Sequence, residues 1–442
     1  MAEKEKKWLE NPAVVIDHGA TRCTVGMAGE KFPRAVLPTV VGRPKESVAA
    51  RIPDLKNFYI GSEAELKGDK ILLLRHPLYK GMIDNWDDMA KIWDCIYSKH
   101  LRINPEDHPV LLTEAPLVPI INREKMCQVM FETFNPPAMY IAIHQVLFLY
   151  ATGQLDGLVL DSGHDVTYAV PIYKGYSISK AITRLNFGGR DLTYILAKSL
   201  ASKSGDNCVR RQSKYGSTSG DAKSNLWEEV ARNVKERYCY VAADFQAEMK
   251  KLQAESQDSR SNVSKKITQT YELPDGKTVN IEAERFMIPE GLFQPSMINE
   301  PDSLGFHQAV HESIQKIKDH NNSNTNIQEI SQLQKSMYNN IYLCGRNCLF
   351  PGLKERLKNE IQKCASNSMG SVSVRVKHAP EGSNPNGPVP SAWVGGSILA
   401  SLPTFQNMWI SRQQYDEWGP SIVHQKCVQG TPDGESSTAL EY

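Results

Sequence analysis

The chain has 442 residues, enough for two or more domains with sizeable cores, and its 51 Lys and Arg balance 50 Asp and Glu. This balance excludes a net field that would draw the protein to nucleic acid or to a membrane surface. Nine cysteines without a Cys-x-x-Cys pair indicate free thiols in a reducing compartment, and no apolar run is long enough to span a bilayer. Because residues 1–10 are charged, no signal peptide is predicted, and we expect a soluble, intracellular protein.

The first hundred residues predict short strands followed by one clear helix. Residues 14–42 indicate strands with turns at His18-Gly19 and Ala28-Gly29, whereas residues 43–70 are polar and irregular. Asn85 is a predicted N-cap. The helix after it carries its apolar side chains on one face, namely Trp86, Met89, Ile92, Trp93 and Ile96.

The following segments are less regular. Residues 110–112 predict a short buried strand, and Asn122 is expected to cap a second helix. Residues 138–150 are strongly apolar and predict a buried helix. Several polar stretches lack the apolar content for a core of their own and are expected at the surface. They are residues 203–224, 251–267, 318–334, 381–390 and 428–442.

The most informative pattern occurs twice and predicts a phosphate-binding turn. Two buried-strand runs, residues 14–18 and 158–162, each lead into Asp-x-Gly and a second apolar run, as in a β-hairpin. Glycine lets the N–H groups of the turn approach a phosphate closely. Asp17 and Asp161, at the two strand ends, can hold a hydrated Mg²⁺ through carboxylate and water oxygens. Two such hairpins suggest a duplicated fold that closes on a nucleotide from both sides.

Beyond this pattern, long stretches of the chain closely resemble the actin family. Examples are Asn-Trp-Asp-Asp-Met at residues 85–89 and Gly-Gly-Ser-Ile-Leu-Ala-Ser-Leu at residues 395–402. Further matching stretches lie at residues 32–36, 41–44, 108–117, 122–126, 130–135, 271–276 and 420–427. The resemblance covers residues 12–427.

The resemblance implies an α/β, actin-like fold, with two duplicated, ribonuclease-H-like domains of two subdomains each around a nucleotide cleft. The small outer domain would comprise residues 1–151 and 381–442, with subdomain 2 at about residues 39–76. The large inner domain would comprise residues 152–380, with subdomain 4 at about residues 188–299. ATP or ADP with Mg²⁺ or Ca²⁺ is implied in the cleft, so the two hairpins correspond to the two phosphate loops.

The resemblance also implies the site residues. His144, Asp161 and Tyr168 occupy the catalytic positions, and the cation is implied near Asp17 and Asp161, through water. The implied phosphate-binding positions are Asp17, Gly19, Ala20, Thr21, Thr24, Gly163, His164 and Asp165. The implied adenosine-binding positions are Gly189, Lys235, Glu236, Gly345, Arg346 and Phe350.

Several phosphate and catalytic positions depart from the family pattern. Thr24 replaces the lysine that contacts the phosphates and Ala20 a serine, so nucleotide affinity is expected to fall, because charge-assisted bonds are the stronger ones. His144 and Tyr168 replace the glutamine and histidine that position the attacking water, and His164-Asp165 replaces Asp-Gly. Since phosphoryl transfer depends on positioning and electrostatics, we expect slow or absent hydrolysis. His144 could act as a base instead, but we favour a histidine that packs and hydrogen-bonds at the cleft floor.

The adenosine side is mixed. Lys235 and Glu236 match the family, and Phe350 keeps the flat apolar face of a tyrosine. Arg346 replaces the second glycine of a Gly-Gly turn. It could reach phosphate in place of the missing lysine, block the pocket, or be a solvated turn residue, and the sequence leaves these three open.

The assembly surfaces differ as well. The loop at residues 45–56, which in actins inserts into the next subunit, carries charge and a proline here, and the plug segment at residues 297–305 is altered. We therefore expect self-polymerisation to be lost. The groove that actin partners fill with an amphipathic helix matches the family pattern more closely than these loops do. Its residues could also be retained only because they pack at the hinge between the domains. These are Tyr150, Leu399, Leu402, Thr404 and Met408.

The leading hypothesis is a divergent actin-like cytoskeletal protein, a nucleotide-liganded structural subunit of a larger assembly with weak or absent ATP hydrolysis. Its expected partners are other proteins of a cytoskeletal complex, such as actin-like subunits or motor-associated proteins, in the cytoplasm; neither direct nucleic-acid contacts nor membrane insertion are expected. Two alternatives stay open: an ATP-hydrolysing, filament-forming actin, and an actin-related subunit of a nuclear chromatin-remodelling complex. The actin-specific stretches argue against a sugar kinase or chaperone of the same broad fold.

Overall fold

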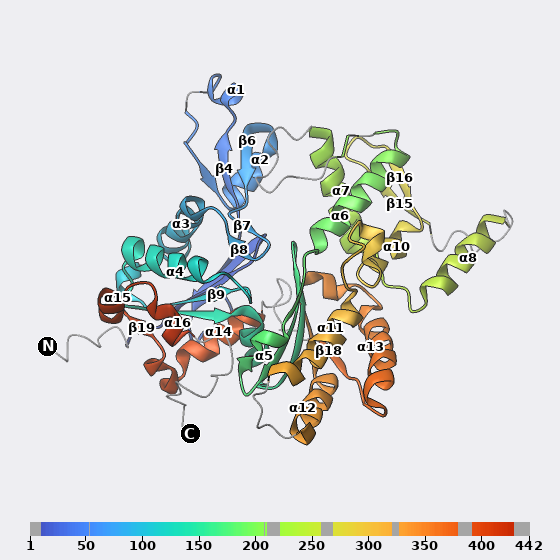
Figure 1. Ribbon diagram of the computed structural model, residues 1–442. Helices are drawn as coiled ribbons and strands as arrows, with labels where there is room; N and C mark the ends of the chain where they lie inside the picture. Colours follow the sequence, from blue (N-terminus) through green and yellow to red (C-terminus); the bar gives the residue numbers. More distant parts are fainter. Residues whose placement is uncertain are drawn as a thin grey trace.

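Two large β-sheets form the framework of the computed structural model, and helices cover them (Figure 1). The structure describes residues 10–52, 54–206, 208–209, 222–257, 268–320, 327–378 and 391–427. The first sheet has the strand order β19 (Ile410–Ser411), β10 (Ala138–Ile143), β9 (Val110–Glu114), β1 (Val14–His18), β2 (Arg22–Met27) and β3 (Ala35–Pro38). The second has the order β13 (Tyr176–Ser177), β12 (Thr167–Tyr173), β11 (Gly157–Ser162), β17 (Ile341–Cys344) and β18 (Val376–His378), with β14 (Thr183–Leu185) also paired to β12.

Both sheets follow one plan, which confirms the two predicted hairpins. In each, an antiparallel hairpin, β1–β2 or β11–β12, is joined by two strands that run parallel to its first strand. The registers correspond, because Asp17 pairs with Thr24 in the first hairpin and Asp161 with Tyr168 in the second. The two aspartates therefore occupy equivalent strand ends.

Three smaller sheets accompany the two large ones in the described residues, and the one that holds β4 and β6 lies at the top of Figure 1. On the first side, β4 (Val41–Pro44) pairs with β5 (Tyr59–Ile60) and β6 (Leu72–Arg75), and β7 (Leu78–Tyr79) pairs with β8 (Met82–Ile83). On the second side, β15 (Gln269–Glu272) pairs with β16 (Thr278–Ile281).

The helices divide between the side of the molecule that holds the first sheet, called the first side, and the side that holds the second sheet, called the second side. Those of the first are α1 (Glu46–Ala49), α2 (Ser62–Ile71), α3 (Trp86–Cys95), α4 (Ile120–Val129), α5 (His144–Ala151), α14 (Ser391–Ser401), α15 (Arg412–Trp418) and α16 (Ile422–Lys426). Those of the second are α6 (Gly189–Lys203), α7 (Ala222–Tyr238), α8 (Phe245–Gln257), α10 (Glu284–Glu290), α11 (Phe306–Gln315), α12 (Ile327–Asn339) and α13 (Leu353–Met369). Helices α5 and α14 approach so closely that a Cβ on Gly395 would lie 1.7 Å from the Leu147 carbonyl oxygen, so only glycine fits there.

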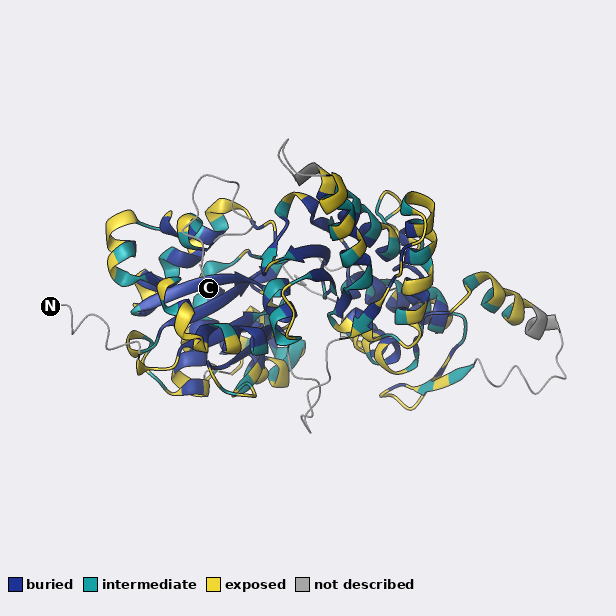
Figure 2. Ribbon diagram, turned by 90° about the horizontal axis from the view of Figure 1, so that it is seen from below, coloured by how far each residue is buried: buried dark blue, intermediate teal, exposed yellow. Residues whose placement is uncertain are grey.

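The buried residues form two main cores, and the strands of both sheets are buried while the outer helices expose one face (Figure 2). The first core joins the N-terminal sheet to α14 and the segment that follows it. The second surrounds the other sheet and helices α6, α7, α11 and α13. Strand β11 alternates between them, since Val159 packs in the first core while Leu158 and Leu160 pack in the second. The domain limits at residues 151/152 and 380/381 stay predictions.

One predicted helix is wrong. Residues 138–150 form strand β10 followed by the short helix α5, not a single buried helix. All six residues of β10 are buried, because it lies between β9 and β19 inside the sheet. A strand buried on both faces is continuously apolar, so its sequence lacks the alternation that separates strand from helix.

Other local predictions had mixed outcomes. Asn85 caps α3 as predicted, its side chain accepting from the Asp88 amide at 2.9 Å. Asn122 does not cap α4, which begins at Ile120 after Pro119; its side chain donates to the Ile83 carbonyl at 2.9 Å. Residues 43–70 are more regular than expected, because strands β4 and β5 and helices α1 and α2 lie there.

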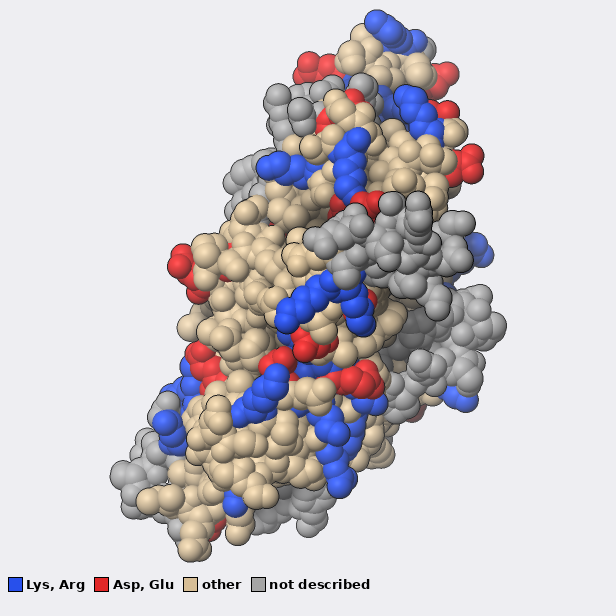
Figure 3. Space-filling view, turned by 90° about the vertical axis from the view of Figure 1, so that its right-hand side faces the viewer, with Lys and Arg blue, Asp and Glu red and all other residues tan. Residues whose placement is uncertain are grey.

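The polar stretches are only partly described. Helix α8 runs to Gln257 and α12 begins at Ile327, so parts of residues 251–267 and 318–334 are helical, and Gln334 on α12 is buried. Residues 210–221, 258–267, 321–326, 379–390 and 428–442 lie outside the described residues. Within the described part of the chain, no helix is long and apolar enough to cross a membrane. On the face shown in Figure 3, Lys and Arg side chains are interspersed with Asp and Glu, as the balanced composition predicts.

Candidate functional site

The two equivalent strand ends meet at the first residue of α5. His144 donates from Nδ1 to Asp17 Oδ1 at 2.9 Å, and its Nε2 lies 3.9 Å from Asp161 Oδ2. Helix α5 follows β10 directly, so the parallel pairing of β10 and β9 in the sheet that holds β1 fixes where His144 begins the helix. The structure thus brings together three of the predicted site residues, with an imidazole between two carboxylates.

The charge state of His144 follows from this position. Burial alone would lower the pKa of His144, but the charge and hydrogen bond of Asp17, with the charge of Asp161, outweigh burial and raise the pKa to about 9. The same pairing lowers the pKa of Asp17 despite its burial. At neutral pH His144 is therefore an imidazolium, and neither of its ring nitrogens can accept a proton.

A second histidine supports Asp17 from the other side without carrying charge. The His18 ring donates from Nδ1 to the Thr113 carbonyl at 3.0 Å, and its Nε2 accepts from Trp93 Nε1 at 2.8 Å. Burial lowers the pKa of His18, so it stays neutral. Thr113 Oγ1 donates to Asp17 Oδ1 at 3.0 Å and accepts from the His18 amide at 2.8 Å. This network fixes the orientation of the Asp17 carboxylate.

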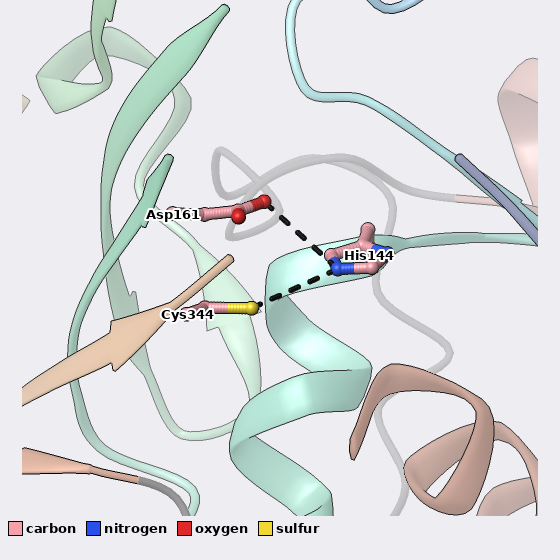
Figure 4. A group of neighbouring side chains, drawn as sticks. All are labelled: His144, Asp161 and Cys344. Atoms are coloured by element: carbon pink, nitrogen blue, oxygen red, sulfur yellow. Dashed lines mark hydrogen bonds and ion pairs between the residues drawn. The ribbon is translucent and has the colours of Figure 1, made fainter. Parts of the chain in front are cut away.

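Two further side chains at Asp161 were missed by sequence reasoning. Gln145 Nε2 donates to Asp161 Oδ2 at 2.6 Å, and Gln145 Oε1 is buried without a hydrogen-bond partner among the described residues. Cys344, the last residue of β17, is the register partner of Asp161, and its Sγ lies 3.8 Å from His144 Nε2 (Figure 4). The position of Cys344 at the end of an apolar strand run is a signal that the sequence offers. Its pairing with Asp161, however, depends on how β11 and β17 are placed in the sheet.

The two hairpin turns offer hydrogen-bond donors. Within the described ranges, the backbone amides of Ala20 and Thr21 in the first turn, and of His164 and Asp165 in the second, donate to no protein acceptor. The carbonyls of the second turn are by contrast engaged, since Gly163 accepts from the Gly189 amide at 3.0 Å and the His164 carbonyl from the Arg190 amide at 2.8 Å. The turns therefore keep N–H groups for an anion such as phosphate.

The second turn carries a carboxylate where the family has glycine. Asp165 is buried, its Oδ2 accepts from the Lys80 amide at 3.4 Å, and its Oδ1 lies 3.5 Å from Arg190 Nη1. Burial raises the pKa of Asp165, although Arg190 acts against the rise. Burial and the nearby cation Lys235 lower the pKa of His164 to about 3, so that imidazole is neutral. The contact of Asp165 with Lys80 joins the second hairpin to the β7–β8 turn of the first side.

The remaining phosphate and catalytic positions lie beside the aspartates. Thr24 is buried and cross-strand from Asp17, so both side chains lie on one face of the sheet. Tyr168 is buried and cross-strand from Asp161, with Arg184 5.8 Å from its ring centroid. Burial raises the pKa of Tyr168 to about 12, so it stays a neutral phenol. Gly19 and Gly163 lie at the start of the two turns.

Only part of the predicted adenosine set comes together. Lys235 Nζ donates to the Gly189 carbonyl and to Thr193 Oγ1, both at 2.8 Å, and burial lowers the pKa of Lys235 to about 8. Gly345 has φ +82°, and a Cβ there would lie 2.2 Å from the Ser162 carbonyl oxygen, which explains why this glycine persists. Glu236 and Arg346 are exposed, and Phe350 is half-buried. Within the described residues Arg346 makes no hydrogen bond or ion pair, which favours the solvated turn residue.

Asn347 is an unpredicted member of this set. It is buried, and its Nδ2 donates to Ser162 Oγ at 3.1 Å and to the Gly163 carbonyl at 2.7 Å, so it ties the segment after β17 to the second turn.

The predicted partner groove is half-open: Tyr150, Leu399 and Met408 pack partly against the first core, while Leu402 and Thr404 are exposed. The Tyr150 hydroxyl also donates to the Gly175 carbonyl at 2.8 Å.

These residues fit a phosphate chain and a hydrated divalent cation, because both turns hold unengaged amides and a carboxylate lies near the end of the first strand of each hairpin. The imidazolium of His144 already supplies one positive charge at that point. A family model described as Actin matches residues 8–428, nearly the whole chain. Proteins of that family generally bind ATP or ADP with a divalent metal, and the chain has their mixed α/β architecture. The chain therefore belongs to the actin family.

Proposed function

We propose that this chain is a nucleotide-liganded structural subunit of a larger cytoskeletal assembly, with weak or absent ATP hydrolysis. The observation that carries the proposal is the 2.9 Å bond from His144 Nδ1 to Asp17 Oδ1. His144 occupies the position at which the family orients the attacking water. The bond holds its imidazole against the Asp17 carboxylate and keeps the imidazole protonated. A protonated imidazole cannot take a proton from an attacking water, so general-base help from His144 is absent at neutral pH.

The phosphates of ATP or ADP would meet the backbone amides of the two turns, and the cation, Mg²⁺ or Ca²⁺, would be held through water by Asp17 and Asp161. That cation supplies charge neutralisation for the phosphate oxygens. Apart from the His144 imidazolium, which is paired with Asp17, the chain contributes little cationic charge at the two turns, because Thr24 is neutral and the second turn adds the carboxylate of Asp165. Affinity for nucleotide is therefore expected to be lower than with a lysine at the first loop.

The assembly surfaces support a subunit role over a self-assembling one. Residues 45–56 hold several charges, and burying unpaired charges in a neighbour's pocket costs free energy. The half-open groove around Leu399 and Met408 remains available for a helix of another protein. We place the protein in the cytoplasm with cytoskeletal partners; an ATP-hydrolysing filament and a nuclear chromatin-remodelling subunit are the alternatives.

Phosphate release, measured beside a conventional actin, tests the proposal. The wild type should release phosphate slowly or not at all. The double variant His144→Gln/Tyr168→His should be faster, because a neutral amide at residue 144 and an imidazole at residue 168 restore groups that can orient water. His100→Gln, which changes an exposed histidine without a hydrogen bond in the described structure, is the matched control. A wild-type rate equal to that of conventional actin refutes the proposal and favours the hydrolysing filament.

A further inference from the structure

We propose that His144, Asp161 and Cys344 form a binding site for Zn²⁺ at the base of the cleft. This site goes beyond the proposed nucleotide function, because its ligand set differs from that of a hydrated Mg²⁺ or Ca²⁺. Within the described ranges it is the one group of His, Cys, Asp or Glu side chains whose ligand atoms lie close enough to share an ion. Figure 4 shows the three side chains converging from β11, β17 and the start of α5.

The distances suit a tetrahedral ion after small side-chain movements. The three ligand atoms lie within 4.8 Å of one another, with 3.8 Å from Cys344 Sγ to His144 Nε2 and 3.9 Å from His144 Nε2 to Asp161 Oδ2. Zinc bonds of about 2.0–2.3 Å place tetrahedral ligands roughly 3.3–3.8 Å apart. Asp161 and Cys344 are register partners on adjacent parallel strands, so the backbone already sets this spacing.

The surrounding side chains have the arrangement typical of a metal-bound histidine. His144 donates its other ring N–H to Asp17, which leaves Nε2 directed towards Asp161 and Cys344. A carboxylate in this position fixes the tautomer of a metal-binding imidazole and increases its basicity. Gln145 in turn donates to Asp161 Oδ2 and orients that carboxylate. The unpartnered, buried Oε1 of Gln145 offers an acceptor beside the site for a water bound to the ion.

The donor atoms select the ion. One sulfur, one imidazole nitrogen and one carboxylate oxygen suit Zn²⁺, whereas Mg²⁺ and Ca²⁺ prefer oxygen alone. The His144 and Asp161 side chains are 25% and 14% exposed, so solvent reaches the site and a fourth coordination position can hold water. Binding releases the Nε2 proton of His144 and the thiol proton of Cys344 to solvent. Zn²⁺ thereby takes the place of the proton as the positive charge between Asp17 and Asp161.

The test uses the full chain, stripped of metal with EDTA and free of nucleotide, so its outcome is independent of whether ATP binds. Zn²⁺ affinity is measured by competition with a chromogenic chelator. Co²⁺ then replaces Zn²⁺ as a spectroscopic probe, because a bound thiolate gives a sulfur-to-cobalt charge-transfer band. Cys344→Ser removes the sulfur ligand. Cys348→Ser is the matched control, because Cys348 lies in the 3₁₀ helix Arg346–Leu349 just after β17 and its Sγ is directed to the Leu160 carbonyl.

We expect one Zn²⁺ per chain that millimolar Mg²⁺ does not displace, and a charge-transfer band with Co²⁺. Cys344→Ser should lose the band and at least tenfold in affinity, whereas Cys348→Ser should keep both. Asp17→Asn should lower the affinity by roughly 10- to 100-fold while keeping the band, because it removes the carboxylate that orients His144 and balances the ion's charge but leaves the sulfur ligand in place. The proposal is overturned if the wild type binds no Zn²⁺, if Cys344→Ser binds as tightly as the wild type, or if Cys348→Ser loses the band equally.

Discussion

The charge state of His144 makes a quantitative prediction about stability. Its pKa is raised from 6.5 to about 9 by the Asp17 and Asp161 carboxylates, so the folded protein holds a proton that the unfolded chain releases between these two pH values. A raised pKa stabilises the folded state fully below 6.5 and loses that contribution as the pH rises through about 9. The full difference in pKa corresponds to roughly 3–4 kcal/mol. Because solvent reaches a quarter of the His144 side chain and screens the pair, we expect about 2–3 kcal/mol.

The variant His144→Gln tests this number, since glutamine is neutral at every pH. Urea unfolding of both proteins, in EDTA and without nucleotide, gives the difference in their free energies of unfolding at each pH. The free energy of unfolding of the wild type should exceed that of the variant by more below pH 6.5 than above pH 9. Between these two pH values, the difference between the two proteins should change by about 2–3 kcal/mol. Lys235, whose pKa is lowered to about 8, titrates in both proteins and therefore cancels.

Two results would refute the reasoning. A free-energy difference that stays constant across this pH range would mean that His144 is not held protonated by Asp17. A difference that grows with rising pH would mean that burial, which lowers the pKa, outweighs the two carboxylates.

Three further outcomes are expected. Asp17→Ala should abolish the rise in melting temperature that ATP and Mg²⁺ give the wild type, because ligand binding stabilises the folded state; no rise in either protein would contradict an occupied cleft. Asp165→Asn should bind a fluorescent ATP analogue roughly three- to tenfold more tightly, since a negative charge leaves the phosphate turn. Asp156→Asn, at the other end of that hairpin, should change nothing, and equal or weaker binding by Asp165→Asn would refute the electrostatic argument. Electron microscopy with ATP and Mg²⁺ should show no long filaments of this chain alone, because residues 45–56 carry charges that a neighbour would have to bury; long two-start filaments would refute this.

The correct sequence predictions depend on short-range patterns. Both hairpins were predicted because each needs only two adjacent strands and the turn between them, and Asn85 was predicted as a cap because its hydrogen bond spans three residues. Strand β10 was mistaken for helix because its neighbours in the sheet, β9 and β19, are distant in the sequence. Asn122 failed as a cap because Pro119 already sets the start of α4.

The sequence by itself determined the duplicated hairpins, the two strand-end aspartates and the membership of the actin family. Only the tertiary structure decided what lies between those aspartates. Cys344 and His144 are 200 residues apart in the chain, and no local pattern encodes their contact. It arises because parallel pairing of β11 with β17 sets Cys344 beside Asp161, while α5, packed between the two sheets, carries His144 to the same point. The charge of His144 follows from that packing, because burial and two carboxylates act together only in the folded state.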